Sequence, residues 1–170
     1  MHSEISKCQK ETSEQMKKTD ARLDKLAKLY GGVSQNQGDS AEEFFFNTLK
    51  GKKRIGDMVF DTIQKNMRVD GKNLKGEYDI VLYNGNSVAI VEVKYKVHIN
   101  DIENLREKKI PNFRKLFPFF DSYKIYAGIA GFHVNDEAVK KAEEHGFFIL
   151  KRKGKIAEFD TDFVREQLAG

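Results

Sequence analysis

The feature that most constrains the fold is a predicted β-hairpin over residues 77–97. Two apolar runs, Glu77 to Tyr83 and Ser87 to Val97, flank the turn sequence Asn84-Gly85-Asn86. Asn-Gly between runs rich in β-branched and aromatic residues is the strongest short-range hairpin signal. Away from their ends both runs are apolar at successive positions, which is typical of central strands covered on both faces. The sequence therefore predicts a sheet with this hairpin at its centre.

Three charged residues interrupt the predicted strands: Asp79, Glu92 and Lys94. Glu92 and Lys94 are two residues apart, so their side chains leave the same face of the strand. A two-residue turn can lie at Asn-Gly or at Gly-Asn, and it places Asp79 opposite Ile90 or opposite Glu92. Asp79 shares the face of Glu92 in both registers, with Cβ atoms about 4.5–5.5 Å apart if directly opposite and about 7–8 Å apart if diagonal. A three-residue turn would move Asp79 to the other face.

Such charged groups on a buried sheet need compensation, because burying an unpaired charge costs several kcal/mol. Two carboxylates that leave other coordination positions of the ion free suit Mg²⁺, which takes one or two carboxylates and keeps several waters. A neighbouring lysine could orient the attacking water or stabilise charge on a phosphate. The pattern favours metal-assisted phosphodiester hydrolysis. The alternative is an exposed Glu92–Lys94 ion pair with Asp79 as an ordinary acid at a strand end.

Asp79, followed after twelve residues by Glu92-Val93-Lys94 at the end of an apolar strand, resembles the motif of the PD-(D/E)XK nuclease superfamily. That superfamily includes restriction endonucleases and archaeal Holliday-junction resolvases. The resemblance covers about residues 38–156 and implies a restriction-endonuclease-like α/β fold, with a mixed central sheet flanked by helices in the order αβββαβ. Tyr78 stands where the family often has proline.

The resemblance also implies roles for individual residues. Asp79 and Glu92 would be metal ligands, with the carbonyl of Val93 as a further one, and Lys94 would position or activate water. The cofactor would be Mg²⁺, for which Mn²⁺ can substitute. The run from Gly38 to Glu42 resembles the start of the resolvase core, where a glutamate after alanine faces the metal site. We therefore prefer Glu42 to Glu43 as the fourth catalytic residue, although helix capping alone would explain both acids.

The net charge of +4 and the pI near 9.0 favour an anionic partner, which on this interpretation is DNA. The candidate phosphate contacts are Lys52, Lys53 and Arg54 after the first core helix, Lys72 in a predicted basic loop over residues 68–76, and Lys96. A solvated charge run explains the same residues equally well.

The chain is long enough for one domain with a core and an appendage. Residues 1–33 form a predicted helix with a half-polar heptad seam, which is either a solvated arm or a coiled coil that makes a homodimer. Residues 34–170 form the predicted nuclease-like domain, entered by a polar linker over residues 34–39. The single cysteine, Cys8, excludes an intramolecular disulfide and favours a cytoplasmic protein. No apolar run reaches the length of a membrane span, and the N-terminus is too polar for a signal peptide.

The remaining elements are predicted from periodicity and from capping residues. They are a helix capped by Asp39 or Ser40 and closed at Gly51, a strand over 58–65, a helix over 102–109 capped by Asp101 and interrupted at Pro111, a strand over 123–132, a helix from Asn135 to Glu144, an edge strand over 147–150, a hairpin arm over 156–159 and a terminal helix over 162–168. Basic residues of the 102–117 region, Lys109 among them, are expected away from its apolar stripe.

The first functional hypothesis is a Mg²⁺-dependent deoxyribonuclease. The second is a catalytically silent nuclease-like domain that binds nucleic acid or a protein. The sequence leaves open whether a substrate would be duplex, branched or single-stranded, and whether cleavage would be internal or from an end.

Overall fold

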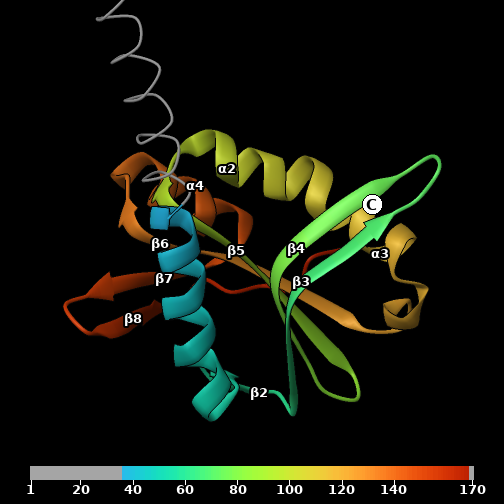
Figure 1. Cartoon of the computed structure of the whole chain (residues 1–170), viewed down its shortest axis with the longest axis horizontal. Helices are drawn as coiled ribbons and strands as arrows, with labels where there is room; N and C mark the ends of the chain where they lie inside the picture. Colours follow the sequence, from blue (N-terminus) through green and yellow to red (C-terminus); the bar gives the residue numbers. More distant parts are fainter. Residues whose placement is uncertain (1–35, 169–170) are drawn as a thin grey trace, which may run out of the picture. The chain divides into compact units, whose positions relative to one another are not determined.

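The computed structural model describes residues 36–168, and the predicted N-terminal helix and coiled coil lie outside these residues. Six strands form one mixed sheet in the order β3-β4-β5-β6-β7-β8, and a separate pair, β1-β2, forms a small second sheet (Figure 1). The strands are β1 (Arg54–Ile55), β2 (Met58–Val59), β3 (Thr62–Asp70), β4 (Lys75–Tyr83), β5 (Ser87–Val97), β6 (Lys124–Val134), β7 (Phe148–Lys153) and β8 (Ile156–Asp160). The predicted mixed α/β class is confirmed.

Helices cover both faces of the sheet. They are a helix over residues 36–52 (helix 36–52), α2 (Ile99–Asn104), the π-helical η1 (Leu105–Lys109), α3 (Ile110–Leu116), the 3₁₀ turn η2 (Pro118–Phe120) and α4 (Asp136–His145). Ala41, Phe45 and Leu49 of helix 36–52 are buried in one core. The other core holds buried residues of α2, η1, α3 and α4. Among residues 36–168 no helix is both long and apolar enough to cross a membrane.

The predicted hairpin is present with a two-residue turn. β4 and β5 are antiparallel, with Tyr83 paired to Val88 and Ile80 paired to Val91. The Asn84 side chain stabilises the turn, because its Oδ1 accepts hydrogen bonds from the backbone N–H groups of Asn86 at 2.9 Å and Ser87 at 2.8 Å. The turn residues are therefore Gly85 and Asn86, which selects the register that aligns Asp79 with Glu92.

The predicted basic loop over residues 68–76 is wrong. β3 runs to Asp70 and pairs residue by residue with β4 as far back as Lys75, which leaves only residues 71–74 as a turn. The turn closes through a 3.1 Å hydrogen bond from the Gly71 N–H to the Leu74 carbonyl. Cross-strand pairing overrides the turn signal of the glycines and lysines. The strand predicted over 58–65 is divided, because β2 ends at Val59 and β3 begins at Thr62.

Helix 36–52 begins earlier and ends later than predicted. Asp39 and Ser40 lie inside the helix and are not its caps, so the polar linker does not extend over residues 36–39. Gly38 alone does not stop the helix, since a glycine costs only about 1 kcal/mol within one. The helix continues past Gly51, and the residue with a left-handed backbone after it is Lys53, with φ 51°.

The region predicted as an interrupted helix is continuous through α2, η1 and α3. Asp101 is in the first turn and accepts a 2.8 Å hydrogen bond from the N–H of His98, which is the N-cap residue. Pro111 is tolerated because it is the second residue of α3, which follows the π-helical segment, and a missing N–H is least costly in the first turn of a helix. The proline therefore marks an irregular turn and not an interruption.

The C-terminal region contains two confirmed elements, which are α4 and the predicted hairpin arm over residues 156–159, now β8, and it contains two corrections. α4 has the predicted Asn135 cap, which accepts from the Glu137 N–H at 2.8 Å, and it ends at Gly146 with φ 74°. β7 is not an edge strand, because β8 pairs with it. The terminal helix predicted over residues 162–168 is wrong, since residues 162–163 form a turn, the following residues are not helical, and Gln167 forms a bridge with Ile125.

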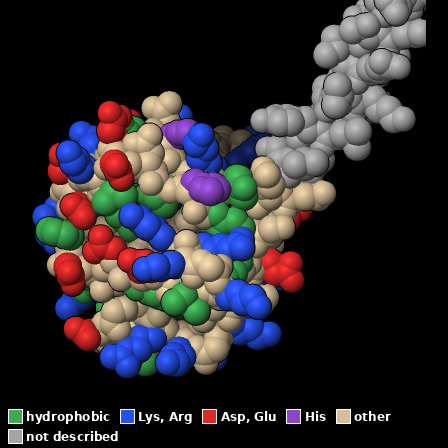
Figure 2. Space-filling view, turned by 90° about the vertical axis from the view of Figure 1, so that its left-hand side faces the viewer, with side chains coloured by type: hydrophobic (Ala, Val, Ile, Leu, Met, Phe, Trp, Pro, Cys, Tyr) green, Lys and Arg blue, Asp and Glu red, His purple; other side chains and the backbone are tan. Residues whose placement is uncertain are grey.

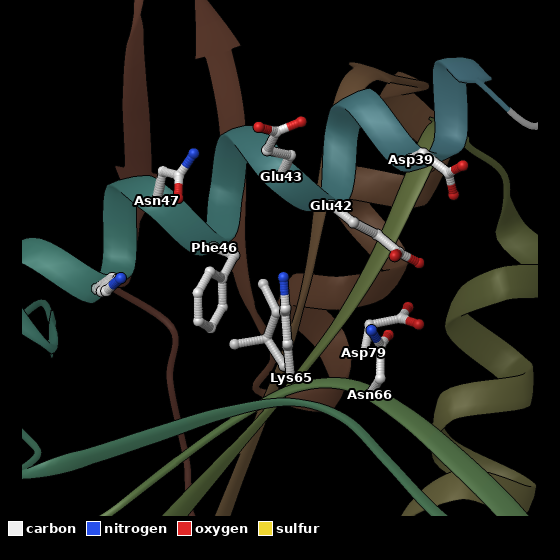
Figure 3. A pocket seen from close by; sticks show the side chains of 10 residues that line it. Asp39, Glu42, Glu43, Phe46, Asn47, Lys65, Asn66 and Asp79 are labelled. Carbon is white, nitrogen blue, oxygen red and sulfur yellow. The ribbon is translucent and has the colours of Figure 1, made fainter.

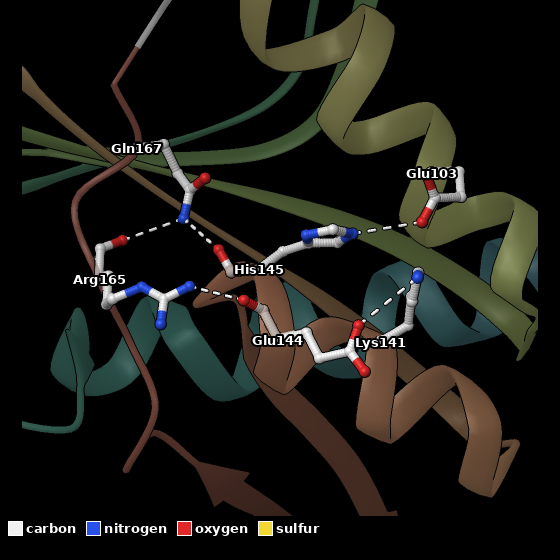
Figure 4. Close-up of polar contacts among 6 residues, drawn as sticks. All are labelled: Glu103, Lys141, Glu144, His145, Arg165 and Gln167. Atoms are coloured by element: carbon white, nitrogen blue, oxygen red, sulfur yellow. Dashed lines mark hydrogen bonds and ion pairs between the residues drawn. The ribbon is translucent and has the colours of Figure 1, made fainter.

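Side chains of this non-helical segment bond to the carbonyls at the end of α4 (Figure 4). Arg165 Nη2 donates to the Glu144 carbonyl at 2.6 Å, and Gln167 Nε2 donates to the His145 carbonyl at 2.8 Å. The last carbonyls of a helix need partners from outside the helix. These tertiary bonds outweigh the weak helix propensity of a seven-residue segment.

Small residues in β6 make room for side chains of the neighbouring strands. A Cβ at Gly128 would lie 2.0 Å from the Phe148 ring of β7. A Cβ at Gly131 would lie 2.5 Å from Val97 of β5. Glycine at these positions lets the central strands keep large apolar neighbours.

Candidate active site

The candidate site lies where β4 and β5 separate. Their regular pairing ends at Ile80 and Val91, so Asp79 and Glu92 are the first residues beyond the ladder. Asp79 Oδ2 accepts a 2.9 Å hydrogen bond from the Val93 N–H and so takes the place of a backbone carbonyl of β4. The Asp79 carboxylate is therefore fixed in the fork between the strands.

β4 rotates at Asp79. Tyr78 and Ile80 are two residues apart and would share a face in a regular strand, yet they belong to different cores. Asn66 lies across from Asp79 in the register of β3, between the pairs Lys65–Ile80 and Met67–Tyr78, and it has φ 55°. A left-handed backbone is uncommon for residues other than glycine and is best tolerated by asparagine and aspartate. Strand distortion at this point accompanies the opening of the fork.

Glu42 of helix 36–52 points toward this fork. Figure 3 shows its carboxylate directed toward Asp79, whereas the neighbouring Glu43 points away. Both line a recess of about 360 Å³ that also includes Asp79 and Asn66. Burial raises the pKa of Glu42 to about 7, and the adjacent negative charge of Asp79 adds to the effect. Of the two candidate glutamates, Glu42 is the one that the fold directs to Asp79.

Glu92 is the only buried residue with a charged side chain among residues 36–168, with 5% of its surface exposed. Within that part of the chain its Oε2 has no hydrogen-bond partner. Burial raises the pKa of Glu92 to about 8, with a further contribution from the Asp79 charge. A carboxylate with these properties is able to bind a cation.

Among residues 36–168, the cation that forms an ion pair with Glu92 is Lys109 of η1, which sequence reasoning missed. Its Nζ lies 3.6 Å from Glu92 Oε2 and donates a hydrogen bond to the Glu77 carbonyl. The same ammonium lies 5.0 Å from the centre of the Tyr78 ring. The Tyr78 hydroxyl in turn donates a 2.7 Å hydrogen bond to the Lys109 carbonyl. Lys109 is therefore held at both its backbone and its side chain.

The π-helical geometry explains why Lys109 was missed. One extra residue in a helical turn rotates every later position by about 100° relative to an α-helix. The expectation that Lys109 lies off the buried side assumed an uninterrupted α-helical period. Pro111 two residues later was the one sequence signal of an irregular helix.

Lys94 lies on the strand that carries Glu92 but is exposed. Its positive charge lowers the pKa of Glu92 less than the charge of Lys109 does. The two lysines thus approach the carboxylate differently: Lys109 is held against it, and Lys94 projects into solvent beside it.

The proposed phosphate contacts do not gather into one group. Lys52, Lys53 and Arg54 lie around the end of helix 36–52, and Arg54 forms a 3.9 Å ion pair with Asp57. Figure 1 shows that helix end and the β3–β4 turn, which contains Lys72, in distant parts of the molecule. The lysines that line the recess beside Glu42 and Asp79 are instead Lys50 and Lys65. Lys96 is exposed on β5.

The donors at the fork fit a hard divalent cation. Asp79 and Glu92 supply carboxylate oxygens, and Glu92 Oε2 is buried without a hydrogen bond. The N–H and C=O of one strand residue leave the same side of the strand, so the Val93 carbonyl faces the opening into which its N–H donates. Residues 36–168 contain no group of three or more His, Cys, Asp or Glu arranged to hold a metal ion. Mg²⁺ needs no such group, because one or two carboxylates with water and phosphate oxygens satisfy it.

The fold and the fork define a mixed α/β protein with a carboxylate site at the end of a β-ladder. No protein-family model matches the chain, and no curated protein matches it. One similar solved structure is protein VC1899 from Vibrio cholerae, with a TM-score of 0.39 and 16% identity over 65% of this chain and 28% of that chain. Another is the small subunit of the heterodimeric restriction endonuclease R.BspD6I, with a TM-score of 0.34 and 13% identity over 69% of this chain and 71% of that chain. Likenesses this distant carry no functional conclusion, which has to come from the site.

Proposed function

We propose that this chain is a Mg²⁺-dependent nuclease of the PD-(D/E)XK type that hydrolyses phosphodiester bonds in DNA. The observation that carries the proposal is the approach of Glu42, Asp79 and Glu92, from three separate segments, to the open end of the β4–β5 pair. The spacing from Asp79 to Glu92-Val93-Lys94 matches the motif, and the net charge of +4 suits a polyanionic substrate.

In the proposed site Asp79, Glu92 and the Val93 carbonyl hold the metal, with Mn²⁺ able to replace Mg²⁺. A bound Mg²⁺ would supply Lewis-acid stabilisation of the phosphate and lower the pKa of a bound water. Glu42 accepts hydrogen bonds from waters on the side of helix 36–52. Lys94 is exposed and long enough to contact a phosphate oxygen or the attacking water, whereas Lys109 compensates the buried charge of Glu92.

Cleavage of a substrate panel tests this function. Purified protein is incubated with labelled linear, nicked, branched and single-stranded DNA, with Mg²⁺, with Mn²⁺ and with a chelator. We expect metal-dependent cleavage of at least one DNA by the parent and by Glu137→Gln, which changes an exposed acid at the start of α4. Asp79→Asn should not cleave. Equal cleavage by Asp79→Asn and the parent would overturn the proposal.

Calorimetric titration separates the nuclease from the silent binding module. We expect Mg²⁺ or Mn²⁺ to bind the parent at millimolar concentration and to bind Asp79→Asn more weakly, because one of the two carboxylate ligands is lost. A parent protein that binds DNA but releases no heat with either metal would favour the silent module.

A further inference from the structure

A second surface lies on the other side of helix 36–52 from the carboxylate recess, where the ends of β5 and β6 meet the β7–β8 hairpin. Two recesses occur there, of about 440 Å³ and about 380 Å³. Both are lined by Phe132, Arg152 and Gly154. Phe44 lies in the first recess, and Tyr95 and His133 line the second. We refer to Phe44, Tyr95, Phe132, His133 and Arg152 as the aromatic surface.

The rings of this surface meet one another edge to face. The centre of Phe132 lies 5.4 Å from Phe44 at 80° and 5.7 Å from Tyr95 at 67°. Tyr95 lies 5.2 Å from the His133 ring at 74°. Phe44, Tyr95 and Phe132 are only partly buried, and His133 is exposed. The rings therefore form one continuous, partly accessible set that a ligand can contact.

Arg152 completes the surface with a planar cation. Its guanidinium carbon lies 4.5 Å from the centre of the Phe132 ring and 5.6 Å from that of Phe44. Its Nε donates a 2.8 Å hydrogen bond to the Gly154 carbonyl, which fixes the plane of the group. No carboxylate within residues 36–168 forms an ion pair with Arg152. The guanidinium is thus held in place without an ion pair, and Glu43 lines the same recess.

The charge around the aromatic surface favours an anion. Lys151, Lys153 and Lys155 lie with Arg152 in the β7–β8 hairpin, where Glu158 is paired across the strands with Lys151. Of the residues that line the two recesses, Glu43 is the one acid, beside Arg152 and Lys155. Figure 2 shows the face of the molecule from which this hairpin projects, where lysine and arginine side chains lie among hydrophobic ones, with acidic side chains mainly toward the left edge of the view. Aromatic rings interleaved with cations are the combination that binds single-stranded nucleic acid, with bases on the rings and phosphates on the cations.

We propose that the aromatic surface is a stacking site for unpaired bases of a nucleic acid. The occupant is single-stranded and not duplex, because ring faces and a guanidinium plane contact exposed base faces, which a duplex keeps stacked on one another. Each recess has the volume of a small-molecule pocket. The inference rests on the proposed function for its choice of DNA, and it makes the preferred substrate one with a single-stranded segment beside the cleaved bond.

Fluorescence anisotropy with three 12-nucleotide probes tests the site in metal-free Asp79→Asn protein. The probes are labelled oligothymidylate, an abasic strand of the same length and charge, and a 12-base-pair duplex. We expect oligothymidylate to bind at least about 10-fold more tightly than the abasic strand, because stacking requires a base. Equal binding of these two strands would overturn the proposal.

Two conservative variants in the same background separate stacking from charge and from folding. Arg152→Lys keeps the positive charge but removes the planar guanidinium group. Phe132→Leu keeps an apolar side chain but removes the aromatic ring. Each should weaken oligothymidylate binding by roughly 5- to 100-fold and change abasic-strand binding by less than about 2-fold. Lys140→Ala removes an exposed charge on α4 and serves as the matched control. Circular dichroism verifies folding of each variant.

The outcomes distinguish this inference from the proposed function. Unchanged oligothymidylate binding by both variants, with metal-dependent cleavage intact in the parent, would refute the stacking site alone. Base-dependent binding that both variants lose, in a protein that cleaves none of the DNA panel, would support the stacking site and refute the nuclease.

Discussion

At their turn end, β4 and β5 pair through four successive residue couples, whereas at their open end the same strands separate beyond Ile80 and Val91. The paired end is apolar and dry: Val81, Leu82, Ala89 and Ile90 are all 0% exposed. The open end holds Asp79 and Glu92, and burial, together with the negative charge of Asp79, raises the pKa of Glu92 to about 8. The comparison teaches that one hairpin supplies stability at one end and carries a charged site at the other.

The largest expected effect is on the cleavage rate, and it comes from a substitution at the open end. Glu92→Gln preserves shape but removes a metal ligand, so cleavage should fall by about 100- to 1,000-fold. Thermal unfolding should stay close to that of the parent, because a buried charge has been removed rather than created. Rates under single-turnover conditions and a melting curve measure both. A large loss of stability would break the comparison, because the open end would then also support the fold.

The paired end should respond in the opposite way. Ile90→Ala should lower the free energy of unfolding by about 2–5 kcal/mol because Ile90 is fully buried. The cleavage rate per folded molecule should be unchanged at low temperature. Urea denaturation measures the change, and Val59→Ala is the control because Val59 is 58% exposed. A stability equal to that of the control would contradict the division between the two ends.

The two lysines near Glu92 sharpen the comparison. Lys109→Met leaves the buried carboxylate without its partner and should lower the free energy of unfolding at pH 8 by about 1–3 kcal/mol. Lys94→Met should change it by less than about 1 kcal/mol, as expected of an exposed charge, while reducing cleavage. Denaturant titrations and single-turnover rates of the two variants give both quantities. The reverse pattern would show that Lys94, not Lys109, compensates Glu92.

A smaller effect on stability is expected for substitutions of Asn66, which lies across from Asp79 in β3. Asn66→Val places a β-branched residue at φ 55°, which should cost about 1–2 kcal/mol. Asn66→Gly should retain the stability of the parent. Both are compared by urea denaturation with Gln64→Val, an exposed position in the regular part of β3. Equal stabilities of Asn66→Val and Asn66→Gly would mean that the left-handed backbone does not constrain the fork.

The most gradual effect is a pH dependence of stability without metal. Burial raises the pKa of Glu92 to about 8 and that of Glu42 to about 7, from 4.5 in an exposed chain. Between pH 4.5 and pH 8 the folded chain binds more protons than the unfolded chain, so the free energy of unfolding falls as the pH rises toward 8. Mg²⁺ should offset the fall, because it binds the deprotonated carboxylates. Unfolding curves from pH 5 to pH 8 measure the slope, which Glu42→Gln/Glu92→Gln should flatten. A stability that rises with pH would contradict the proposed burial of the two acids.

Local patterns were sufficient for much of the fold. The Asn84-Gly85-Asn86 turn and the apolar runs beside it determine the hairpin, and the Asn135 and Gly146 caps determine α4. Parity along β4 and β5 also predicted that Asp79 and Glu92 share a face. These features follow from steric and hydrogen-bonding preferences within a few residues of the chain. The catalytic roles of these acids stay predictions.

Contacts between distant segments decided the rest. The π-helical turn that brings Lys109 to Glu92, the rotation of β4 at Asp79, and the non-helical path of Arg165 and Gln167 along α4 have no distinctive local pattern. Each depends on partners many residues away, and the energies of those contacts exceed the small differences in local propensity. The sequence by itself therefore determined which acids lie together on the sheet, and only the tertiary structure decided which cation compensates them and which aromatic residues lie beside Arg152.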